Sequence, residues 1–581
     1  MSGGLIQLVN KGAQDQLICG NPSFTHFRSV YKRHTEFAME QFELVFKTTN
    51  LRLPATGSLT LRANVEQFSQ LINDCYVVMT LPNIYSPVRP VTGTHANLNS
   101  SSQAIGYEFQ WIRNIGYNMI NYASIVINGQ EIVRHTGEWM KLYADLNFDA
   151  NKKAMVNQMV GNVPEVYDPA NAYDRTNQYP HAISTSPNLA EPSIYGRTLN
   201  VPLHFWFCEN VGAALPLGAL QNSAIEIVVE LTNMYNLFTI RDIRETVNGQ
   251  PNPNFGVRIA PDSSSSLMTM NNFLSPPTPS QAPVPTNPTL MYWNLNPFIE
   301  ANYIFVGDAE LASIARTEHS FLITQVDMVT ADGQYGPSND LSLLMKNLCT
   351  QVVWLAQRSD RVLQNDVDNY TNWDDAYKPP LNTTGLTVGV PGVFTSGNAV
   401  STSVSQRDIL LESSIILDGK ERFSYKQTYF FSQLENYRHQ TGRTSNDIPG
   451  VYTYSFALDH HGVQPSGHIN GSMFNKTLLR NTYIQPPLVT VSDNGNNTPP
   501  ASVCVLKSTL NSPTPTIVNP LARGTDGKLL YSPKDVITIV PSTQVANAVK
   551  TLKYNFRVRA YVESYNYLRV MGGIASVVFS S

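Results

Sequence analysis

The chain has 581 residues, of which 42% are hydrophobic, so it is long enough and apolar enough for two or more domains with sizeable cores. Only 14% of the residues are charged and the net charge is −4, so the chain has no overall basic excess of the kind that favours binding to nucleic acids through their phosphates. The five cysteines are widely spaced without a CxxC pair, which argues against a disulfide framework or a zinc ribbon and favours a reducing compartment.

The beginning of the chain carries no pattern of a targeting or membrane segment. The apolar stretch from Leu5 to Val9 is shorter than a signal peptide requires, and no basic residues precede it. Ser2 occupies the position at which N-myristoylation requires glycine. No apolar run approaches the roughly 18 residues of a membrane-spanning helix. We therefore expect a soluble chain that is made in the cytosol.

Two eight-residue segments have nearly the same sequence and lie half a chain apart. SIVINGQE begins at Ser124 and SIILDGKE begins at Ser414, an offset of 290 (414 − 124) in a chain of 581 residues. Each segment is a β-branched run that ends in Asn-Gly or Asp-Gly, which predicts a two-residue type I′ hairpin with positive φ at both turn residues. The turn residues are Asn128, Gly129, Asp418 and Gly419. The repeat indicates a duplicated all-β domain.

A second pair of similar segments supports the duplication. The matching residues are Phe205, Phe207, Pro216, Gly218 and Ser223 in the first half and Tyr454, Phe456, Pro465, Gly467 and Ser472 in the second half. Their offset is 249 (454 − 205) rather than 290. We therefore expect the first half to contain more residues between its two landmarks.

Strands are predicted along most of the chain, and two segments are predicted to be helical. Apolar residues recur at helical spacing from Trp139 to Leu146, after Thr136 as a suitable N-cap. A shorter helix is expected to begin at Asp308. Residues 554–563 alternate between apolar and polar, as in a strand with one buried face.

Six prolines interrupt the middle of the chain between positions 276 and 288. Proline has no N–H to donate, so this segment cannot be a central strand. We interpret it as a linker or an exposed excursion, at the place where a boundary between duplicated halves is expected. Other polar stretches, at roughly 85–102, 147–197, 360–406 and 485–544, are long enough to be functional or disordered loops.

Several segments resemble the major capsid proteins of nucleocytoplasmic large DNA viruses. The resemblance begins with GNPSFTHFRSVYKRHTEFAME at Gly20. It continues, in the same order, with IGYNMI, INGQEI, HTGEWM, FWFCENVGAALPLGALQ, LDGKERF, VYTYSFALD, QPSGHIN and ESYNYLRVMGGIASVVF. These blocks are collinear and reach Phe579, so the resemblance covers almost the whole chain.

The resemblance implies an all-β fold of two tandem eight-stranded jelly rolls, a double jelly roll, with long surface loops and a few short helices. On this basis we divide the chain into four parts. They are an N-terminal arm at 1–20, a first jelly roll at 21–235, a Pro/Ser-rich interdomain excursion at 236–295 and a second jelly roll at 296–581.

The resemblance also implies a structural function. The expected protein is a major capsid protein whose homotrimers form pseudo-hexagonal capsomers that tile an icosahedral virus shell. Expected partners are the chain itself, neighbouring capsomers, and minor capsid proteins and a penton at the base of the shell. An inner membrane is expected to be adjacent but not penetrated, and no cofactor, metal or direct nucleic-acid contact is expected. The protein is expected in the virion, after synthesis and assembly in the host cytoplasm.

The alternative, from a different functional class, is a tandem β-sandwich that binds or cleaves carbohydrate. Trp373 beside Asp374 and Asp375 has the composition of a sugar-binding loop, although an ordinary solvated loop has it too. A cleaving enzyme needs two carboxylates that face each other, and the sequence offers no compelling pair. No Walker A loop, GxSxG elbow, HExxH helix or GxGxxG turn is present. We predict that the chain is not an enzyme.

Two groups of residues could hold ligands. Asp459, His460, His461 and His468 are close in sequence, but no Cys or Glu at a fitting spacing completes a zinc site, so we expect a polar hairpin or loop tip. The basic and aromatic run from Phe24 to His34 could stack on bases and hold phosphates. Because the run is short and the chain is acidic, we expect it to contact protein at the base of the capsomer instead.

The sequence contains six N-x-[ST] sequons, as expected by chance in an Asn-rich chain without a secretory route. Four of them fall in the predicted outer loops, and the family includes glycosylated members. The candidate glycosylation sites are therefore Asn99, Asn369, Asn382 and Asn496.

Overall fold

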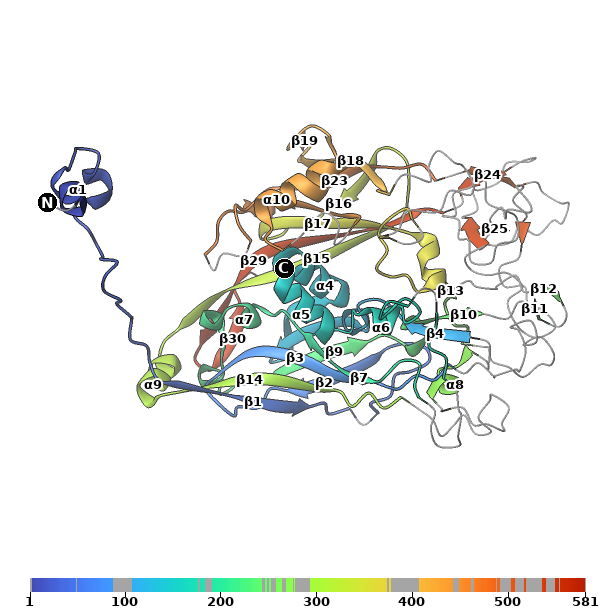
Figure 1. Cartoon of the computed structure of the whole chain (residues 1–581), viewed down its shortest axis with the longest axis horizontal. Coiled ribbons are helices and arrows are strands. Elements are labelled where there is room, and N and C mark those ends of the chain that lie inside the picture. Colours follow the sequence, from blue (N-terminus) through green and yellow to red (C-terminus); the bar gives the residue numbers. More distant parts are fainter. Residues whose placement is uncertain are drawn as a thin grey trace.

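The computed structural model describes residues 3–579 except 49, 87–106, 176–177, 183–190, most of 243–292, 374–375, 378–406, 443–448, 461–463, 487 and most of 492–553. The described chain forms a body of layered sheets, from which an N-terminal arm extends (Figure 1). Among the described residues, no helix has the length and apolar character needed to span a membrane.

The first jelly roll is built on a five-stranded and a four-stranded antiparallel sheet. One sheet has the order β1 (Phe37–Val45), β14 (Phe298–Val306), β3 (Leu71–Leu81), β7 (Arg197–Pro202), with β8 (Leu215–Pro216) also paired to β3. The other sheet has the order β2 (Leu59–Asn64), β9 (Ile225–Leu231), β5 (Ile120–Ile127), β6 (Gln130–Thr136).

The second half repeats this pattern. One sheet has the order β15 (His319–Gln334), β29 (Phe556–Met571), β17 (Leu348–Arg358), β21 (Val451–Ser455), with β22 (Ile469–Asn470) beside β17 and β30 (Ile574–Val577) beside β29. The other has the order β16 (Asn339–Ser342), β23 (Thr477–Tyr483), β18 (Leu410–Leu417), β19 (Lys420–Glu421), with β20 (Lys426–Gln427) also paired to β18.

The strand order identifies each half as a jelly roll. When the eight main strands of a half are numbered along the chain, both halves give sheets of order 1-8-3-6 and 2-7-4-5. This arrangement is the double-sheet jelly roll, in which eight strands form two Greek keys. The predicted all-β fold of two tandem jelly rolls is therefore confirmed, together with the long connections and short helices.

The remaining described elements are short. The strands are β4 (Tyr107–Trp111), β10 (Phe238–Asp242), β11 (Thr246–Val247), β12 (Gln250–Pro251), β13 (Arg258–Ile259), β24 (Leu488–Val491), β25 (Val503–Leu506), β26 (Ile517–Val518), β27 (Val536–Ile539) and β28 (Val549–Leu552). The helices are α1 (Gly3–Val9), α2 (Gln16–Cys19), α3 (Ile115–Asn118), α4 (Gly137–Asn147), α5 (Ala150–Met159), α6 (Pro164–Tyr167), α7 (Trp206–Glu209), α8 (Asn271–Leu274), α9 (Asp308–Arg316), the π-helix η7 (Phe430–Leu434) and α10 (Glu435–His439).

The predicted helix after Thr136 is α4, and the Thr136 hydroxyl accepts a hydrogen bond from the Trp139 N–H at 3.1 Å.

The two repeated hairpins occupy the same place in the two jelly rolls. All four turn residues have positive φ, between 46° and 80°. The Asn128 N–H donates to the Ala224 carbonyl, and the Asn128 Oδ1 accepts from the Ala224 N–H at 2.9 Å. Asp418 makes the same two bonds with Lys476, immediately before β23. Each turn is thereby fastened to the start of the neighbouring strand.

This pairing also corrects the register of the second repeat. Ala224 and Lys476 differ by 252 positions (476 − 224), not by 249, so the matched residues of that repeat are displaced by three. The first half was expected to contain more residues between its two landmarks, and this is confirmed. Asn128 and Ala224 are 96 positions apart, whereas Asp418 and Lys476 are 58 positions apart.

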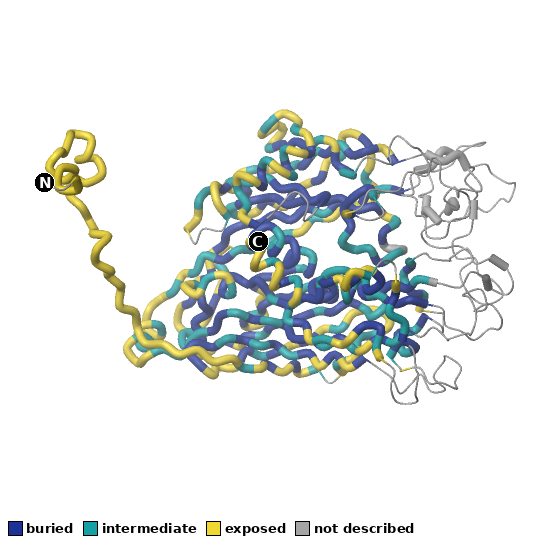
Figure 2. Tube along the Cα trace, in the orientation of Figure 1, coloured by how far each residue is buried: buried dark blue, intermediate teal, exposed yellow. Residues whose placement is uncertain are grey.

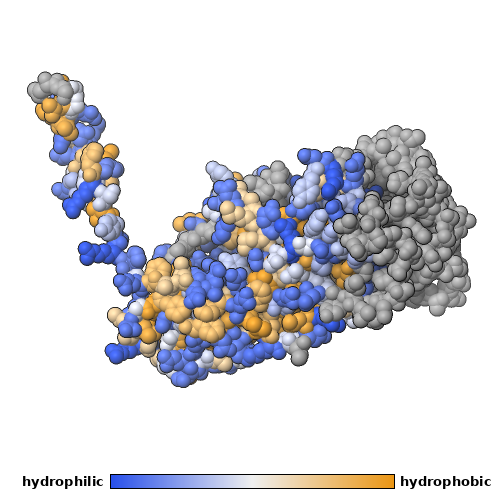
Figure 3. All heavy atoms as spheres, turned by 60° about the horizontal axis from the view of Figure 1, so that its bottom comes forward, coloured by the Kyte–Doolittle hydropathy of each residue, from blue (hydrophilic) through white to orange (hydrophobic). Residues whose placement is uncertain are grey.

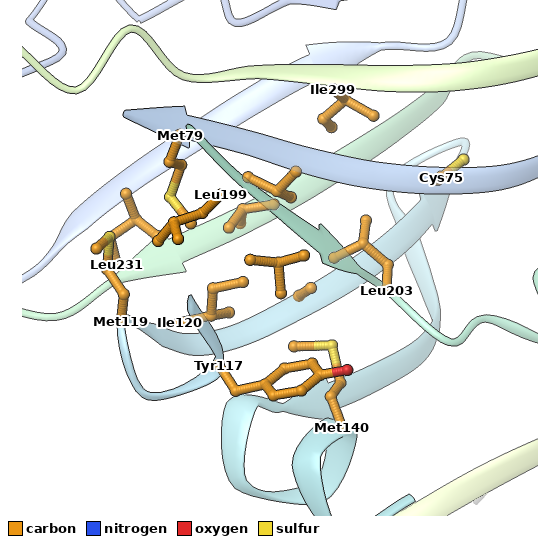
Figure 4. Packing of buried hydrophobic residues seen from close by; sticks show 14 of the residues in the cluster. Cys75, Met79, Tyr117, Met119, Ile120, Met140, Leu199, Leu203, Leu231 and Ile299 are labelled. Carbon is orange, nitrogen blue, oxygen red and sulfur yellow. The ribbon is translucent and has the colours of Figure 1, made fainter. Parts of the chain in front are cut away.

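Two large hydrophobic cores fill the jelly rolls, and a third cluster lies between them. Figure 2 shows the buried residues continuing through both halves of the body, while the arm is exposed throughout. In the first core, residues from different elements of both sheets meet, as Met79, Leu199, Leu231 and Ile299 do in Figure 4.

The strands β15 and β29, each 16 residues long, contribute to both large cores. Phe556 and Val562 of β29 lie in the second core, whereas Leu568 and Val570 of the same strand lie in the first. Ile323 of β15 also lies in the first core. At about 3.3 Å per residue, such a strand is roughly 50 Å long, so it can reach across both domains.

The strand β14 lies beyond the predicted domain boundary at residue 295, yet it pairs with β1 and β3 of the first half. Local composition cannot reveal this pairing, because the partners of β14 lie more than 200 residues earlier in the chain. A division of the chain by sheets would therefore assign β14 to the first jelly roll.

Candidate assembly surfaces

One contact between the two jelly rolls is made by α4. This helix follows β6 of the first jelly roll and places one apolar stripe on the second. The stripe consists of Trp139, Leu142 and Leu146, whose exposed fractions are 2% or less. The surface that receives it is formed by Val353, Leu355, Tyr370, Val451 and Tyr561. The outer face of β17, β21 and β29 is therefore covered by a helix of the other domain.

The Glu138 carboxylate on α4 accepts hydrogen bonds from three side chains of the second jelly roll. Glu138 accepts hydrogen bonds from the Arg559 Nη2 at 2.7 Å, from the Tyr370 hydroxyl at 2.8 Å and from the Tyr561 hydroxyl. Burial alone would lower the pKa of Arg559, but the neighbouring Glu138 carboxylate raises it above its ordinary value. The guanidinium therefore stays charged inside the contact.

A second ion pair lies one turn further along α4. The Lys141 Nζ is 2.9 Å from the Asp368 Oδ1, and both side chains are less than a tenth exposed. Asp368 also accepts from the Asn114 Nδ2 at 2.6 Å. Burial would lower the pKa of Lys141, but Asp368 and Asp145 raise it. Because each charge is paired and hydrogen-bonded, the two ion pairs restrict how the domains fit together.

One buried carboxyl at the same boundary is held close to its neutral form. Glu563 of β29 is buried, and burial raises its pKa to about 7. The Gln351 Nε2 donates to it, which opposes the shift, and Glu209 from the first jelly roll adds to the shift. The pKa of this carboxyl on the second jelly roll is therefore raised both by burial and by a negative charge on the first.

The N-terminal arm makes no covering contact with the body. Every described residue from 3 to 40 is exposed, and α1 stands at the far end of the arm, away from the sheets (Figures 1 and 2). The exposed residues include large apolar ones. They are Leu5, Ile6, Leu8, Val9, Leu17, Ile18, Phe24, Phe27, Val30 and Tyr31. Soluble monomers rarely expose so many apolar residues together, so such a segment indicates a binding surface.

The edge strand β1, to which the arm is attached, is also largely exposed. Phe37, Met39 and Val45 have exposed fractions of 54%, 58% and 69%, and all three point to the same side of β1. Figure 3, which brings this side of the molecule forward, shows hydrophobic side chains gathered beside the attachment of the arm. An unpaired edge with apolar side chains is suited to contact with another chain.

The predicted glycosylation sites divide into two groups. Asn99, Asn382 and Asn496 lie outside the described residues. Asn369 is only 2% exposed, and its Nδ2, the atom that would carry a glycan, donates to the Asp366 Oδ2 and the Trp373 carbonyl, each at 2.9 Å. The expectation that Asn369 lies on an exposed outer loop is therefore wrong.

Those candidate ligand-binding residues that the structure describes are not gathered into a metal site. The His460 Nε2 is 2.7 Å from the Ser455 hydroxyl, His468 is exposed, and His461 lies outside the described residues. In the part of the chain that the structure describes, no three His, Cys, Asp or Glu residues are placed to hold a metal ion. Asp374 and Asp375 also lie outside the described residues.

The interdomain charges were not anticipated from the sequence. Glu138 and Lys141 lie on the predicted helix between apolar residues, and such charges are usually solvated. The one available indication is that they share the helix with a stripe of buried apolar residues. Their partners Asp368 and Arg559 are 227 and 421 positions away, and local pattern does not connect residues at that separation.

Profiles of two capsid families match the chain. Residues 25–270 match "Major capsid protein N-terminus", and residues 310–511 match "Large eukaryotic DNA virus major capsid protein". The chain is 25% identical to the major capsid protein of Phaeocystis pouchetii virus over 539 residues, which cover 83% of this chain and 92% of the relative. It is 24% identical to that of Paramecium bursaria Chlorella virus 1 over 495 residues, covering 83% and 88%.

A solved structure shares the fold over nearly the whole chain. A chain of the quasi-atomic capsid of PBCV-1 virus has a TM-score of 0.57 and 18% sequence identity. The match covers 96% of this chain and 100% of that chain. The comparison supports the double jelly roll described above.

We predict that Glu138→Ala destabilises the protein by about 3 kcal/mol, because it leaves the largely buried Arg559, whose side chain is 15% exposed, without its carboxylate. The measurement is urea unfolding, combined with limited proteolysis of the boundary between the domains. Arg557→Ala is the matched control on the same strand. Arg557 pairs with Asp332 in an exposed ion pair, so its loss should cost less than about 1 kcal/mol. Equal effects of the two variants would contradict the role of Glu138.

We also predict that Glu563 makes stability depend on pH. Because its pKa is about 7 in the folded chain and near 4.5 otherwise, the folded state binds more protons between these values. The free energy of unfolding should therefore fall as pH rises from 4.5 to 7, by at most about 3 kcal/mol. Glu563→Gln should remove this part of the pH dependence, as measured by denaturant unfolding at pH 5, 6, 7 and 8. Parallel pH profiles for the two proteins would refute the prediction.

Proposed function

Since the chain belongs to the family of major capsid proteins of large eukaryotic DNA viruses, we propose that three copies form one capsomer with a pseudo-hexagonal outline. The observation that carries this proposal is the identical strand order of the two jelly rolls. A threefold ring of such chains contains six walls of nearly the same shape, and closed symmetry makes the ring a finite block. The capsomers would then tile an icosahedral shell.

The family assigns a structural role in the virion capsid, not an enzymatic one. Within that role, the exposed arm would contact other components after the body has folded. We propose that these partners are neighbouring capsomers, and minor capsid proteins and a penton at the base of the shell. An inner membrane would lie next to the capsomer without being penetrated, and assembly would take place in the host cytoplasm.

The proposed domain division follows from the same role. The arm comprises residues 1–20, and the first jelly roll comprises 21–235 together with β14. The segment 236–295 is then an excursion that precedes the last strand of the first jelly roll, and the second jelly roll follows. The sequons at Asn99, Asn382 and Asn496 stay candidates for modification on the outer surface.

The first test is the mass of the protein in solution. We expect a trimer of about 194 kDa, three times 64.6 kDa, with a hexagonal outline in projection. Sedimentation and negative-stain imaging provide the two measurements. A monomer that stays monomeric at high concentration and binds an oligosaccharide would favour the alternative, a carbohydrate-binding β-sandwich.

The second test concerns the arm. We expect deletion of residues 1–20 to leave the melting temperature and the trimer unchanged, because every described residue of this segment is exposed. Assembly into larger shells or sheets of capsomers should be impaired, as measured by light scattering and electron microscopy. If the truncated chain unfolds, the arm is part of the folded core. If the truncated chain assembles normally, the proposed role of the arm in assembly is wrong.

A further inference from the structure

Both jelly rolls carry a helix at the same place, after the strand segments that pair with the fourth main strand, which are β6 in the first and β19 and β20 in the second. In the first, α4 follows β6, and in the second, residues 428–439 form one continuous helical segment after β20, which includes η7 and α10. The first of these helices covers the outer face of the second jelly roll, as described above. The second helix has no jelly roll beyond it in the same chain, and this raises the question of what it covers.

Strand pairing gives the correspondence between the two helices. Tyr122 pairs with Thr136, and Glu412, which is 290 positions after Tyr122, pairs with Gln427. Residues of the first helix therefore correspond to residues 291 positions later. Met140 and Phe431 (431 − 140 = 291) fit this relation, because each is completely buried in the core of its own jelly roll.

The correspondence identifies the counterpart of the contact stripe. The stripe residues Trp139, Leu142 and Leu146 of α4 correspond to Phe430, Gln433 and Tyr437, and Glu138 beside the stripe corresponds to Tyr429. Phe430 is partly buried against the core of its own jelly roll, so the exposed part of the second stripe is Tyr429, Gln433 and Tyr437. Leu142 and Leu146 are 0% and 1% exposed, whereas Tyr429 is 58% and Tyr437 is 88% exposed. The segment η7 is a π-helix, whose turn contains up to one residue more than a turn of α-helix. The residue that corresponds to Leu146 is therefore Tyr437 or its neighbour Arg438. The second stripe thus presents two tyrosines to solvent.

The receiving face has a counterpart too. In the second jelly roll it lies on β17, β21 and β29, and the equivalent strands of the first are β3, β7 and β14. Two rows of paired residues cross these strands on the side away from the core. The rows are Tyr76 with Glu300 and Pro202, and Val78 with Phe298 and Asn200. All of these residues are partly exposed except Val78, which is buried.

We propose that the stripe of Tyr429, Gln433 and Tyr437 docks on the outer face of β3, β7 and β14 of a second copy of the chain. The contact would repeat between copies the contact that α4 makes within one copy. A head-to-tail contact forms a closed ring when its rotation closes, as the proposed trimer requires. This inference rests on the proposed trimer and specifies which surfaces form it.

Residue chemistry supports this pairing of surfaces. Tyrosine is enriched among the residues that dominate binding energy at protein interfaces, since it combines a large apolar ring with a hydroxyl. Arg438, at the end of the stripe, is exposed and positively charged. On the receiving face, Glu43 of β1 pairs with Glu300, and these two carboxylates offer the complementary charge. Opposite charges of this kind favour the correct partner and orientation.

The decisive experiment is the variant Tyr437→Asp in the full-length protein. Because this side chain is exposed in the single chain, the substitution should leave the melting temperature unchanged, while a charge placed in the contact should weaken trimer formation at least tenfold. Tyr173→Asp is the matched control. Tyr173 is 74% exposed and lies between α6 and β7, outside both proposed surfaces. Sedimentation over a concentration series measures the effect.

The outcomes separate this inference from the proposed function. If the unaltered protein and the double variant Tyr429→Asp/Tyr437→Asp form trimers equally well, the docking surface is wrong and the trimer stands. If the unaltered protein forms no trimer, both proposals fail. Loss of trimer in Tyr437→Asp but not in Tyr173→Asp supports both.

Cross-linking provides a test that does not depend on disrupting the trimer. In a chain with Cys19→Ser, which removes an exposed thiol, Tyr437→Cys is combined with Asn200→Cys on the proposed receiving face. A short bismaleimide should link the copies into dimers and trimers, while each single variant should yield far less product. An equal yield from the single variants, or none from the pair in intact trimers, would overturn the proposed contact.

Discussion

The pairing of β15 with β29 is the constraint on which the rest of the molecule depends. Each of the two strands is 16 residues long, and each supplies side chains to the cores of both jelly rolls. The relative position of the domains is therefore set by hydrogen-bonded backbone, and a flexible linker does not decide it. With that position fixed, α4 meets the outer face of β17, β21 and β29, and its apolar stripe becomes buried there.

The ion pairs at this boundary add specificity to the fit. A buried ion pair contributes little net stability compared with apolar side chains of similar volume, but an unpaired buried charge is costly. Glu138 with Arg559, and Lys141 with Asp368, are therefore satisfied in one arrangement of the domains. A capsid subunit needs this property, because small errors of angle within one subunit accumulate across a shell of many copies.

Short sequence patterns were sufficient to predict the elements whose structure depends on neighbouring residues alone. The Asn128-Gly129 and Asp418-Gly419 turns and the helix capped by Thr136 are encoded within a few residues, and the repeat of the hairpin indicated the duplication. Features that depend on distant partners were not accessible. The pairing of β14 with β1, the burial of Asn369 and the charged contacts of Glu138 each join segments or environments that no short pattern describes. The three-residue displacement of the second repeat has the same origin, since strand pairing sets the register.

The position of β14 and β29 has a consequence for synthesis on the ribosome. Each lies at the centre of its sheet, between β1 and β3 or between β15 and β17, yet each is the last main strand of its jelly roll to be made. At about 5 to 20 residues per second, the 217 residues from Leu81 to Phe298 take roughly 10 to 40 s to emerge. During that time the facing edges of β1 and β3 lack the strand that separates them, and unpaired edges invite aggregation. The nascent chain therefore exposes these edges until its central strand arrives, and the second jelly roll can close only after β29 has been made.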